Sequence, residues 1–217
     1  MDSYPQSGGA PPAFDLSGGH PVLDLVNTLD HRFRDEPPVE LLPDYEALLS
    51  FARQSEVLDP EQVRALRTSV KPQAAARALS SARELREALA TVLYGDLEDR
   101  PPPASAIRTL ERHFLAAEQH RELRWQKTAT SDRRPGMRWQ WAGAQKEAEF
   151  PVWILAGLAG QLMLSEATQR VRACEADPCR WLFLDTSKNH TRRWCNMKIC
   201  GNRVKARRFQ ARRAAGR

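Results

Sequence analysis

Four cysteines constrain this chain more than any other feature, because all of them fall within 27 residues near its C-terminal end. Cys174 and Cys179 form one C-x4-C pair, and after fifteen further residues Cys195 and Cys200 form a second. Two close pairs joined by a loop suit a tetrahedral ion, because each pair can supply two ligands from one tight turn. Thiolates are the soft ligands that zinc prefers in structural sites. The pattern therefore predicts one structural zinc ion held by these four residues.

Two alternatives to zinc binding by the four cysteines stay open at this point. Two disulfides would need an oxidising compartment, and residues 1–12 lack the basic stretch and hydrophobic segment of an export signal. Four unrelated core cysteines would be scattered, yet the first 173 residues contain none. His190 lies between the pairs and could replace one ligand, although a complete thiolate set makes this unnecessary. A closed four-thiolate shell leaves no position for water, so the ion is expected to be structural and not catalytic.

Positive charge is concentrated in the same part of the chain. Residues 171–217 hold 13 Lys and Arg against 3 Asp and Glu, whereas residues 1–170 hold 20 against 24. A mildly acidic body with a basic end indicates a polyanionic partner bound by that end. The last stretch, VKARRFQARRAAGR, is a good helix former. Fixed by zinc at its N-terminus, such a helix can lie in a major groove or along phosphates.

The predicted nucleic-acid contacts are the cations of this end, most of them arginines, which pair bidentately with phosphate and with guanine edges. Most are expected to touch phosphates only. Two of them lie beside the second cysteine pair, so replacing both with alanine is expected to weaken duplex DNA binding. The alternatives are a solvated tail and a finger that binds RNA or a protein. The predicted contacts are Lys188, Arg192, Arg193, Lys198, Arg203, Lys205, Arg207, Arg208, Arg212 and Arg213.

The preceding residues read as a mainly helical α+β domain. Two alternating segments, Glu122–Thr128 and Met137–Ala142, predict a β-hairpin whose tryptophans are expected to join the core. Phe14–Asn27 fits either two short strands or a strand and the start of a helix. Apolar periodicity and caps predict helices over Pro43–Leu58, Asp59–Val70, Ala75–Tyr94, Ser105–Gln119 and from Pro151 through Leu164 toward Arg172.

The predicted organisation is a disordered tail over residues 1–13, a regulatory or sensing domain over 14–170, and a finger over 171–217 that ends in a basic helix. The apolar run Phe150–Leu164 is shorter than the roughly 20 residues that a membrane span needs, so we expect a buried helix and a cytoplasmic protein. No nucleophile elbow, phosphate loop or recognisable pair of catalytic acids is present, which argues against an enzyme.

The larger domain is expected to sense a small-molecule effector, to form a homodimer, or both. If they are helical, Asp24, Asn27 and His31 fall at i, i+3 and i+7 on one face and could line a ligand pocket. The competing interpretation is that the three side chains cap and brace the early part of the fold.

The C-terminal motifs resemble a known family. The CxxxxC pair, WLFLDTSKN and RRWCNMKICGNRVKARR, within about Arg172–Arg208, closely resemble the CGNR zinc-finger family of bacterial proteins. The resemblance implies zinc ligation by the four cysteines. The stretch GGHPVLDLVNT is similar to the start of the ABATE domain that commonly precedes this finger. Proteins of this arrangement are regarded as stress-induced transcription regulators, and the resemblance implies that role here.

Overall fold

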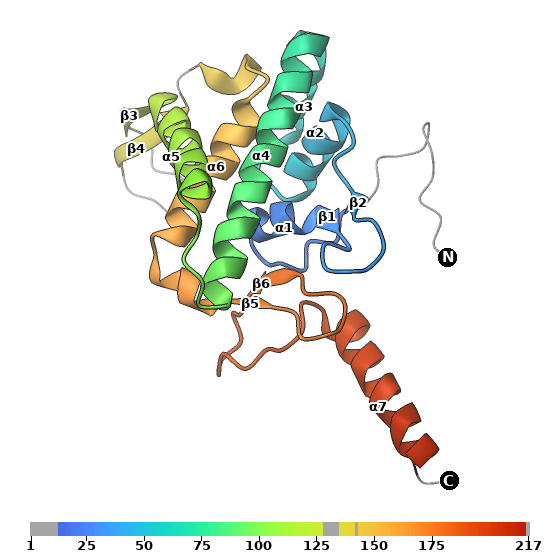
Figure 1. Ribbon diagram of the computed structural model, residues 1–217. Helices are drawn as coiled ribbons and strands as arrows, with labels where there is room; N and C mark the ends of the chain where they lie inside the picture. The colour runs from blue at the N-terminus through green and yellow to red at the C-terminus, as the bar shows by residue number, and fades with distance from the viewer. Residues whose placement is uncertain (1–12, 128–134, 142, 216–217) are drawn as a thin grey trace.

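The computed structural model describes residues 13–127, 135–141 and 143–215, so the predicted disordered tail, apart from Ala13, lies outside the described residues. The described part is mainly helical with three small antiparallel strand pairs, which confirms the predicted α+β class (Figure 1). The helices are α1 (Pro21–Asn27), α2 (Tyr45–Gln54), α3 (Pro60–Ser69), α4 (Pro72–Leu97), α5 (Ala104–Gln119), α6 (Phe150–Met163) and α7 (Asn202–Ala215). The strand pairs are β1 (Leu29–Asp30) with β2 (Val39–Glu40), β3 (Arg121–Gln126) with β4 (Gly136–Trp141), and β5 (Val171–Ala173) with β6 (Leu182–Leu184). Shorter helical segments are η1 (Ala144–Lys146), η2 (Glu166–Arg170) and η3 (Met197–Gly201).

Local capping explains where several helices begin and end. The Asp59 carboxylate accepts a hydrogen bond from the Gln62 backbone N–H (2.8 Å), and the Gln62 side chain accepts one from the Asp59 N–H (2.9 Å). This capping box confirms the predicted start of α3. Helix α4 begins earlier than predicted because Pro72 occupies its first turn, where the missing N–H has no partner to lose. Helix α6 ends at Met163 and does not continue toward Arg172, because the Ser165 side chain caps η2.

The hydrophobic core surrounds α6. This helix is apolar on most of its surface, as expected for a helix packed on several sides. Helices α1, α2, α4 and α5 contact it, and Phe51, Leu89 and Leu155 are fully buried in one shared cluster. The expectation of a buried core helix over Phe150–Leu164 is therefore confirmed, and no helix in the described ranges has the length and apolar character to cross a bilayer. The result is a packed body (residues 14–170) that can act as a rigid support.

The β3–β4 hairpin forms as predicted, with Arg121 opposite Trp141 and Gln126 opposite Gly136. The expectation that its tryptophans join the core is correct only for Trp141, which packs edge-to-face on Phe150 at a ring distance of 5.7 Å. Trp125 and Trp139 are 58% and 54% exposed. Alternation along a strand predicts which residues share a face, and it does not predict whether that face is buried. Here the body packs against the base of the hairpin, where Trp141 lies.

The strand pair β5–β6 docks the finger (residues 171–217) on the body. Val171 and Leu182 belong to the main core. Asn27 of α1 holds the Leu182 backbone from both sides, because its Nδ2 donates to the Leu182 carbonyl and its Oδ1 accepts from the Leu182 N–H, each at 2.9 Å. The Leu184 N–H donates to the Gly18 carbonyl (2.8 Å). The finger is therefore continuous with the body core, while α7 projects away from it (Figure 1).

The C-terminal end of α4 provides a second attachment for the finger. The Tyr94 hydroxyl donates to the Arg180 carbonyl (2.9 Å), and the Arg180 guanidinium pairs with Glu98 at 2.9 Å. The Trp181 indole N–H donates to the Asp30 carboxylate (2.8 Å). These contacts join residues that are far apart in the sequence, and no local pattern indicates them.

Candidate metal centre and nucleic-acid interface

A tight turn after β5 presents the first two thiols. The Cys174 N–H donates to the Trp181 carbonyl at 2.9 Å, which extends the β5–β6 pairing by one residue. The chain then turns, and the Cys179 N–H donates to the Ala176 carbonyl at 2.6 Å. Because the strands belong to the body core, this turn is supported by the folded helical domain.

The second turn presents Cys195 and Cys200. The Asn196 side chain accepts hydrogen bonds from two backbone N–H groups of η3 (3.0 and 3.3 Å), and the Cys200 N–H donates to the Asn196 carbonyl at 2.9 Å. Gly201 allows close packing here, since a β-carbon at this position would lie 2.5 Å from the Met197 sulfur and would displace that side chain. Helix α7 starts at the next residue, so the second cysteine pair sets its origin.

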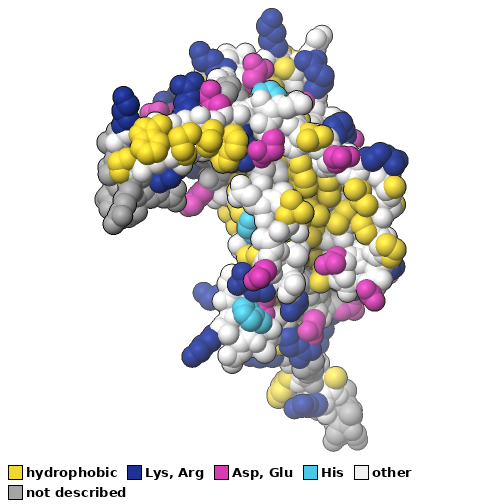
Figure 2. Space-filling view, turned by 90° about the vertical axis from the view of Figure 1, so that its left-hand side faces the viewer, with side chains coloured by type: hydrophobic (Ala, Val, Ile, Leu, Met, Phe, Trp, Pro, Cys, Tyr) yellow, Lys and Arg dark blue, Asp and Glu magenta, His cyan; other side chains and the backbone are white. Residues whose placement is uncertain are grey.

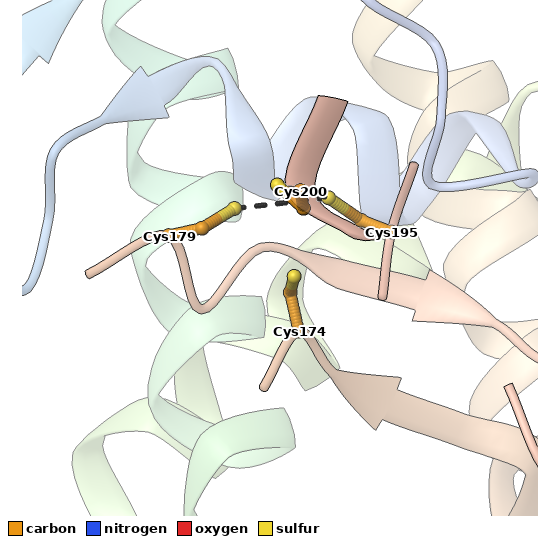
Figure 3. A group of neighbouring side chains, drawn as sticks. All are labelled: Cys174, Cys179, Cys195 and Cys200. Atoms are coloured by element: carbon orange, nitrogen blue, oxygen red, sulfur yellow. Dashed lines mark hydrogen bonds between the residues drawn. The ribbon is translucent and has the colours of Figure 1, made fainter. Parts of the chain in front are cut away.

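The four sulfur atoms converge on one point (Figure 3). The Cys195 Sγ lies 3.7 Å from the Sγ atoms of Cys179 and Cys200, and all four sulfurs lie within 4.8 Å of one another. A tetrahedron with zinc–sulfur bonds of about 2.3 Å has edges of about 3.8 Å. A disulfide needs sulfurs about 2.0 Å apart, and all four cysteines are free. The disulfide alternative is therefore wrong, and the geometry fits one zinc ion.

Crowding of the four thiols explains why a cation belongs among them. The hydrogen bond from Cys179 lowers the pKa of the Cys174 thiol, whereas the hydrogen bond to Cys174 raises the pKa of the Cys195 thiol. Without a cation, ionisation of one thiol thus opposes ionisation of the next. A divalent ion offsets this repulsion and allows four thiolates, which couples metal binding to folding of the finger. The closed thiolate shell makes this a structural zinc site.

A small apolar cluster surrounds the thiols. Phe183 is fully buried in it, and Trp181, Trp194 and Val204 pack against it. Trp194 is partly buried and packs on the cysteine turn. His190 is not part of the sulfur tetrad, and its ring Nδ1 lies 3.3 Å from the Asp185 carbonyl.

Most of the predicted nucleic-acid contacts lie on α7 or near its start. The described cationic side chains of α7 are exposed, and the Arg207 Nη1 donates to the Asp177 carbonyl (2.9 Å), which ties the helix to the first cysteine turn. Lys188 and Lys198 are also exposed, in the loop after β6 and on η3. The side chain of Arg208 lies outside the described residues. The exposed α7 cations are Arg203, Lys205, Arg207, Arg212 and Arg213.

Arg192 does not lie on the surface that we predicted for it. Its Nε donates to the Trp194 carbonyl (2.9 Å), and its Nη2 donates to the carbonyls of Ser17 (3.2 Å) and Cys195. The guanidinium also lies over the Phe183 ring, 4.6 Å from its centroid. Arg192 is therefore a brace between the second cysteine turn and the N-terminal segment of the body, because its donors are used inside the protein.

Arg193, the next residue, has a different environment. It forms an ion pair with Glu175 (Nε to Oε2, 2.7 Å), and both side chains are 49% exposed. An exposed pair of this kind contributes about 0–1 kcal/mol and can open for another anion. Arg193 thus remains a predicted phosphate contact, whereas Arg192 needs its own test.

Asp24, Asn27 and His31 do not share one helix face, as the predicted ligand pocket assumed. Asp24 is buried and accepts a hydrogen bond from the Gly18 N–H (2.8 Å), while Asn27 holds the Leu182 backbone. His31 lies beyond the end of α1 with a positive φ of 58°, so the helical spacing does not extend to it. The competing interpretation, in which these residues brace the early fold, describes Asp24 and Asn27 correctly.

A cavity is found elsewhere, at the C-terminal end of α4. It has a volume of about 440 Å³, and its lining includes the apolar side chains of Val92, Leu93 and Met163 and the carboxyl group of Asp96. The remaining lining residues are Asp99, Arg100, Pro101, Pro102 and Thr168. Sequence reasoning missed this cavity because its walls come from α4, the proline-rich connection to α5, and the segment around η2.

Burial gives Asp24 an unusual titration. Burial raises the pKa of its carboxyl from about 3.8 to about 7, although the Gly18 N–H opposes the shift. Between about pH 4 and pH 7 the folded protein therefore keeps the Asp24 carboxyl protonated, whereas the unfolded chain releases this proton. The contribution of Asp24 to the free energy of unfolding is complete below about pH 4 and is lost as the pH rises to about 7. We therefore compare the free energies of unfolding of Asp24→Asn and wild type at about pH 5 and pH 8. The difference between the two proteins is expected to shift by about 2–3 kcal/mol in favour of Asp24→Asn from the lower to the higher pH.

Urea unfolding of both proteins at the two pH values measures this difference. The exposed Asp35→Asn is the control and is expected to show no such gain. A difference between Asp24→Asn and wild type that is the same at both pH values contradicts the raised pKa.

The comparisons with known proteins agree with these structural findings. Residues 170–213 match the model of the CGNR zinc finger. Residues 19–169 match the ABATE model, described as "Putative stress-induced transcription regulator". The two matches follow one another in the order predicted from the motifs. No curated protein matches the chain.

Proposed function

This chain belongs to the ABATE family and carries a CGNR zinc finger at its C-terminal end, and from this premise we propose that it regulates transcription by binding duplex DNA through the finger and α7. The observation that carries the proposal is the position of α7. The helix starts two residues after the last zinc ligand, projects from the body (Figure 1), and contains six cations and no acidic residue. The proposed role is non-catalytic and is carried out in the cytoplasm.

The dimensions of α7 suit a groove of duplex DNA. Its 14 residues span about 21 Å at about 1.5 Å per residue. The major groove of B-DNA is about 12 Å wide and admits a helix of this kind. Lys205 and Arg212 are seven residues apart and therefore share one face, while Arg203 and Arg207 lie on the opposite one. A helix placed in the groove with either face inward has cations directed at both bases and phosphates.

Replacing two cations on one face of α7 tests the proposal. We expect Lys205→Gln with Arg212→Gln to weaken binding of the zinc-loaded full chain to duplex DNA by about tenfold and to reduce the salt slope by about two, because two phosphate contacts are lost. Glutamine keeps the helix, since its helix propensity is close to that of lysine and arginine. Fluorescence anisotropy at several salt concentrations gives both quantities.

A matched control removes the same charge from the body. Arg64→Gln with Lys71→Gln changes two exposed cations on and beside α3, at a distance from α7, and is expected to leave affinity and slope unchanged. Equal effects of the two double variants would mean that net charge alone drives binding, which contradicts a specific role for α7. Tighter binding to structured RNA than to duplex DNA at the same salt favours the RNA-binding alternative, and binding to neither favours protein docking.

We also assign a sensing role to the body, supported by the cavity beside α4. Leu93 and Asp96 line the cavity, and Tyr94 and Glu98 on the same helical end hold Arg180 of the finger. An effector bound there contacts the helix end on which the finger rests, so it can change how the finger is held. A ligand-induced rise in melting temperature of the full chain, lost when Val92→Trp fills the cavity, supports this role.

A further inference from the structure

The β3–β4 hairpin has one polar and one apolar face. Leu123 pairs with Trp139, and Trp125 pairs with Met137, so the two pairs are neighbours on one side of the ribbon. All four side chains are between 48% and 58% exposed. The residues between them, including Arg124 opposite Arg138, form the other face. Figure 2 shows a row of hydrophobic side chains along this arm. We call Leu123, Trp125, Met137 and Trp139 the hairpin face.

The body holds only the base of the hairpin. Trp141 packs on Phe150, and the Arg121 guanidinium lies over the rings of Trp139 and Trp141 at 5.0 and 5.7 Å from their centroids. A two-stranded ribbon is marginally stable alone, and its apolar side normally needs a cover. Tryptophan and methionine are enriched in the buried centres of protein interfaces, whereas contiguous apolar patches are uncommon on monomers. The hairpin face therefore has the composition of an interface.

We propose that the hairpin face forms a homodimer interface in which each copy covers the face of the other. The four residues carry no charge, and Arg121, which falls on the same side of the ribbon, lies against tryptophan rings. The complement must therefore be an uncharged apolar surface of similar length. A second copy of the same hairpin provides one, and a two-fold axis makes such a face self-complementary.

The carboxylates beside the hairpin face are paired within one copy. Glu118 pairs with Arg121 at 2.7 Å, and Glu122 pairs with Arg124 at 2.5 Å. Neither carboxylate needs a partner from a second copy, so the contact is expected to be mainly apolar, and its orientation is set by the two-fold axis.

The exposed area indicates a dimer of low affinity. An aromatic side chain buries about 150–250 Å² when fully covered, so four half-exposed side chains leave roughly 400 Å² per copy. Pairing two copies covers about 800 Å² before the rim is counted, which is below the roughly 1,200 Å² of stable interfaces and fits a weak, transient dimer. We expect a dissociation constant in the micromolar range. Helix α7 lies at the opposite end of the molecule from the hairpin, so both fingers of the dimer stay clear of the contact (Figure 1).

Sedimentation equilibrium of the zinc-loaded full chain, without nucleic acid, tests the proposal. The wild type is expected to show a monomer–dimer equilibrium between about 1 and 200 µM. Trp125→Thr with Trp139→Thr keeps residues of high β propensity and should raise the dissociation constant at least tenfold. The control is Leu164→Thr, which removes an 87% exposed hydrophobic side chain outside the hairpin and should change nothing.

A second variant guards against loss of the hairpin itself. Met137→Glu alters a half-exposed side chain without removing a core contact, and it places an unpaired charge in the apolar contact, so it should also dissociate the dimer. Circular dichroism checks that each variant is folded. A wild type that is monomeric at every concentration overturns the proposal, as does a dimer that both hairpin variants leave intact. Neither outcome bears on DNA binding, because no DNA is present.

Discussion

Removal of zinc is expected to unfold the finger beyond β6 while the helical body stays folded. The finger core contains little besides the four cysteines, Ala176 and Phe183, with two tryptophans and Val204 at its edge. Structural zinc contributes about 10–16 kcal/mol of apparent binding energy in small fingers, and this cluster has no apolar surface to replace it. The body has its own core around α6 and does not depend on the ion.

Hydrogen exchange of the full chain before and after treatment with a strong chelator measures this effect. Amide protection should be lost over η3 and the start of α7 and retained in α4 and α6, and added zinc should restore it. Cys195→Ser, which removes the sulfur that lies 3.7 Å from two others, should reproduce the loss. A metal-free, reduced protein in which η3 remains protected contradicts the structural role of zinc.

Arg192→Ala is expected to have the second largest effect, a loss of about 3 kcal/mol in the free energy of unfolding. Its guanidinium donates to the carbonyls of Ser17, Trp194 and Cys195, and removing it leaves these partly buried groups without their donor. The contact to Ser17 also joins the finger to the body, so zinc affinity should fall together with stability. Arg192→Lys keeps the charge but lacks the planar fork, and an intermediate loss is expected.

Arg193→Ala is the matched control at the neighbouring position. Because its ion pair with Glu175 is half exposed, the expected loss of stability is below about 1 kcal/mol. If Arg193 contacts a phosphate, this variant should reduce the salt slope of DNA binding by about one without affecting folding. Denaturant unfolding and the DNA titration together separate the two residues. Equal destabilisation by the two alanine variants would contradict the brace that we assign to Arg192.

These two neighbours show the limit of inference from sequence. Both arginines precede Cys195, and both were predicted to contact DNA. Nothing in the local pattern distinguishes an arginine whose donors meet backbone carbonyls from one that pairs with an exposed carboxylate. One of the Arg192 contacts reaches a residue 175 positions away in the chain, so its role depends on how the finger docks.

The hairpin shows a similar limit at the level of a whole element. Alternation correctly predicted the strands and which side chains share a face. It did not reveal that only Trp141 reaches the body, because the distance from a strand to the core is a property of packing. The same holds for Asn27, whose amide serves the β6 backbone and does not line a pocket.

The sequence by itself determined the chemistry that is local. Four thiols at C-x4-C spacing identify a zinc site because few other arrangements need that set of soft ligands, and caps such as that of Asp59 follow from residues three positions apart. The cationic, acid-free character of α7 is likewise a property of the sequence. Only the tertiary structure decided which side chains remain available to a partner. Docking of β5–β6 on α1 used the amide of Asn27, and docking of the finger used the donors of Arg192, whereas packing of the body on Trp141 left the hairpin face exposed. Burial and hydrogen-bond partners are set by segments distant in the chain.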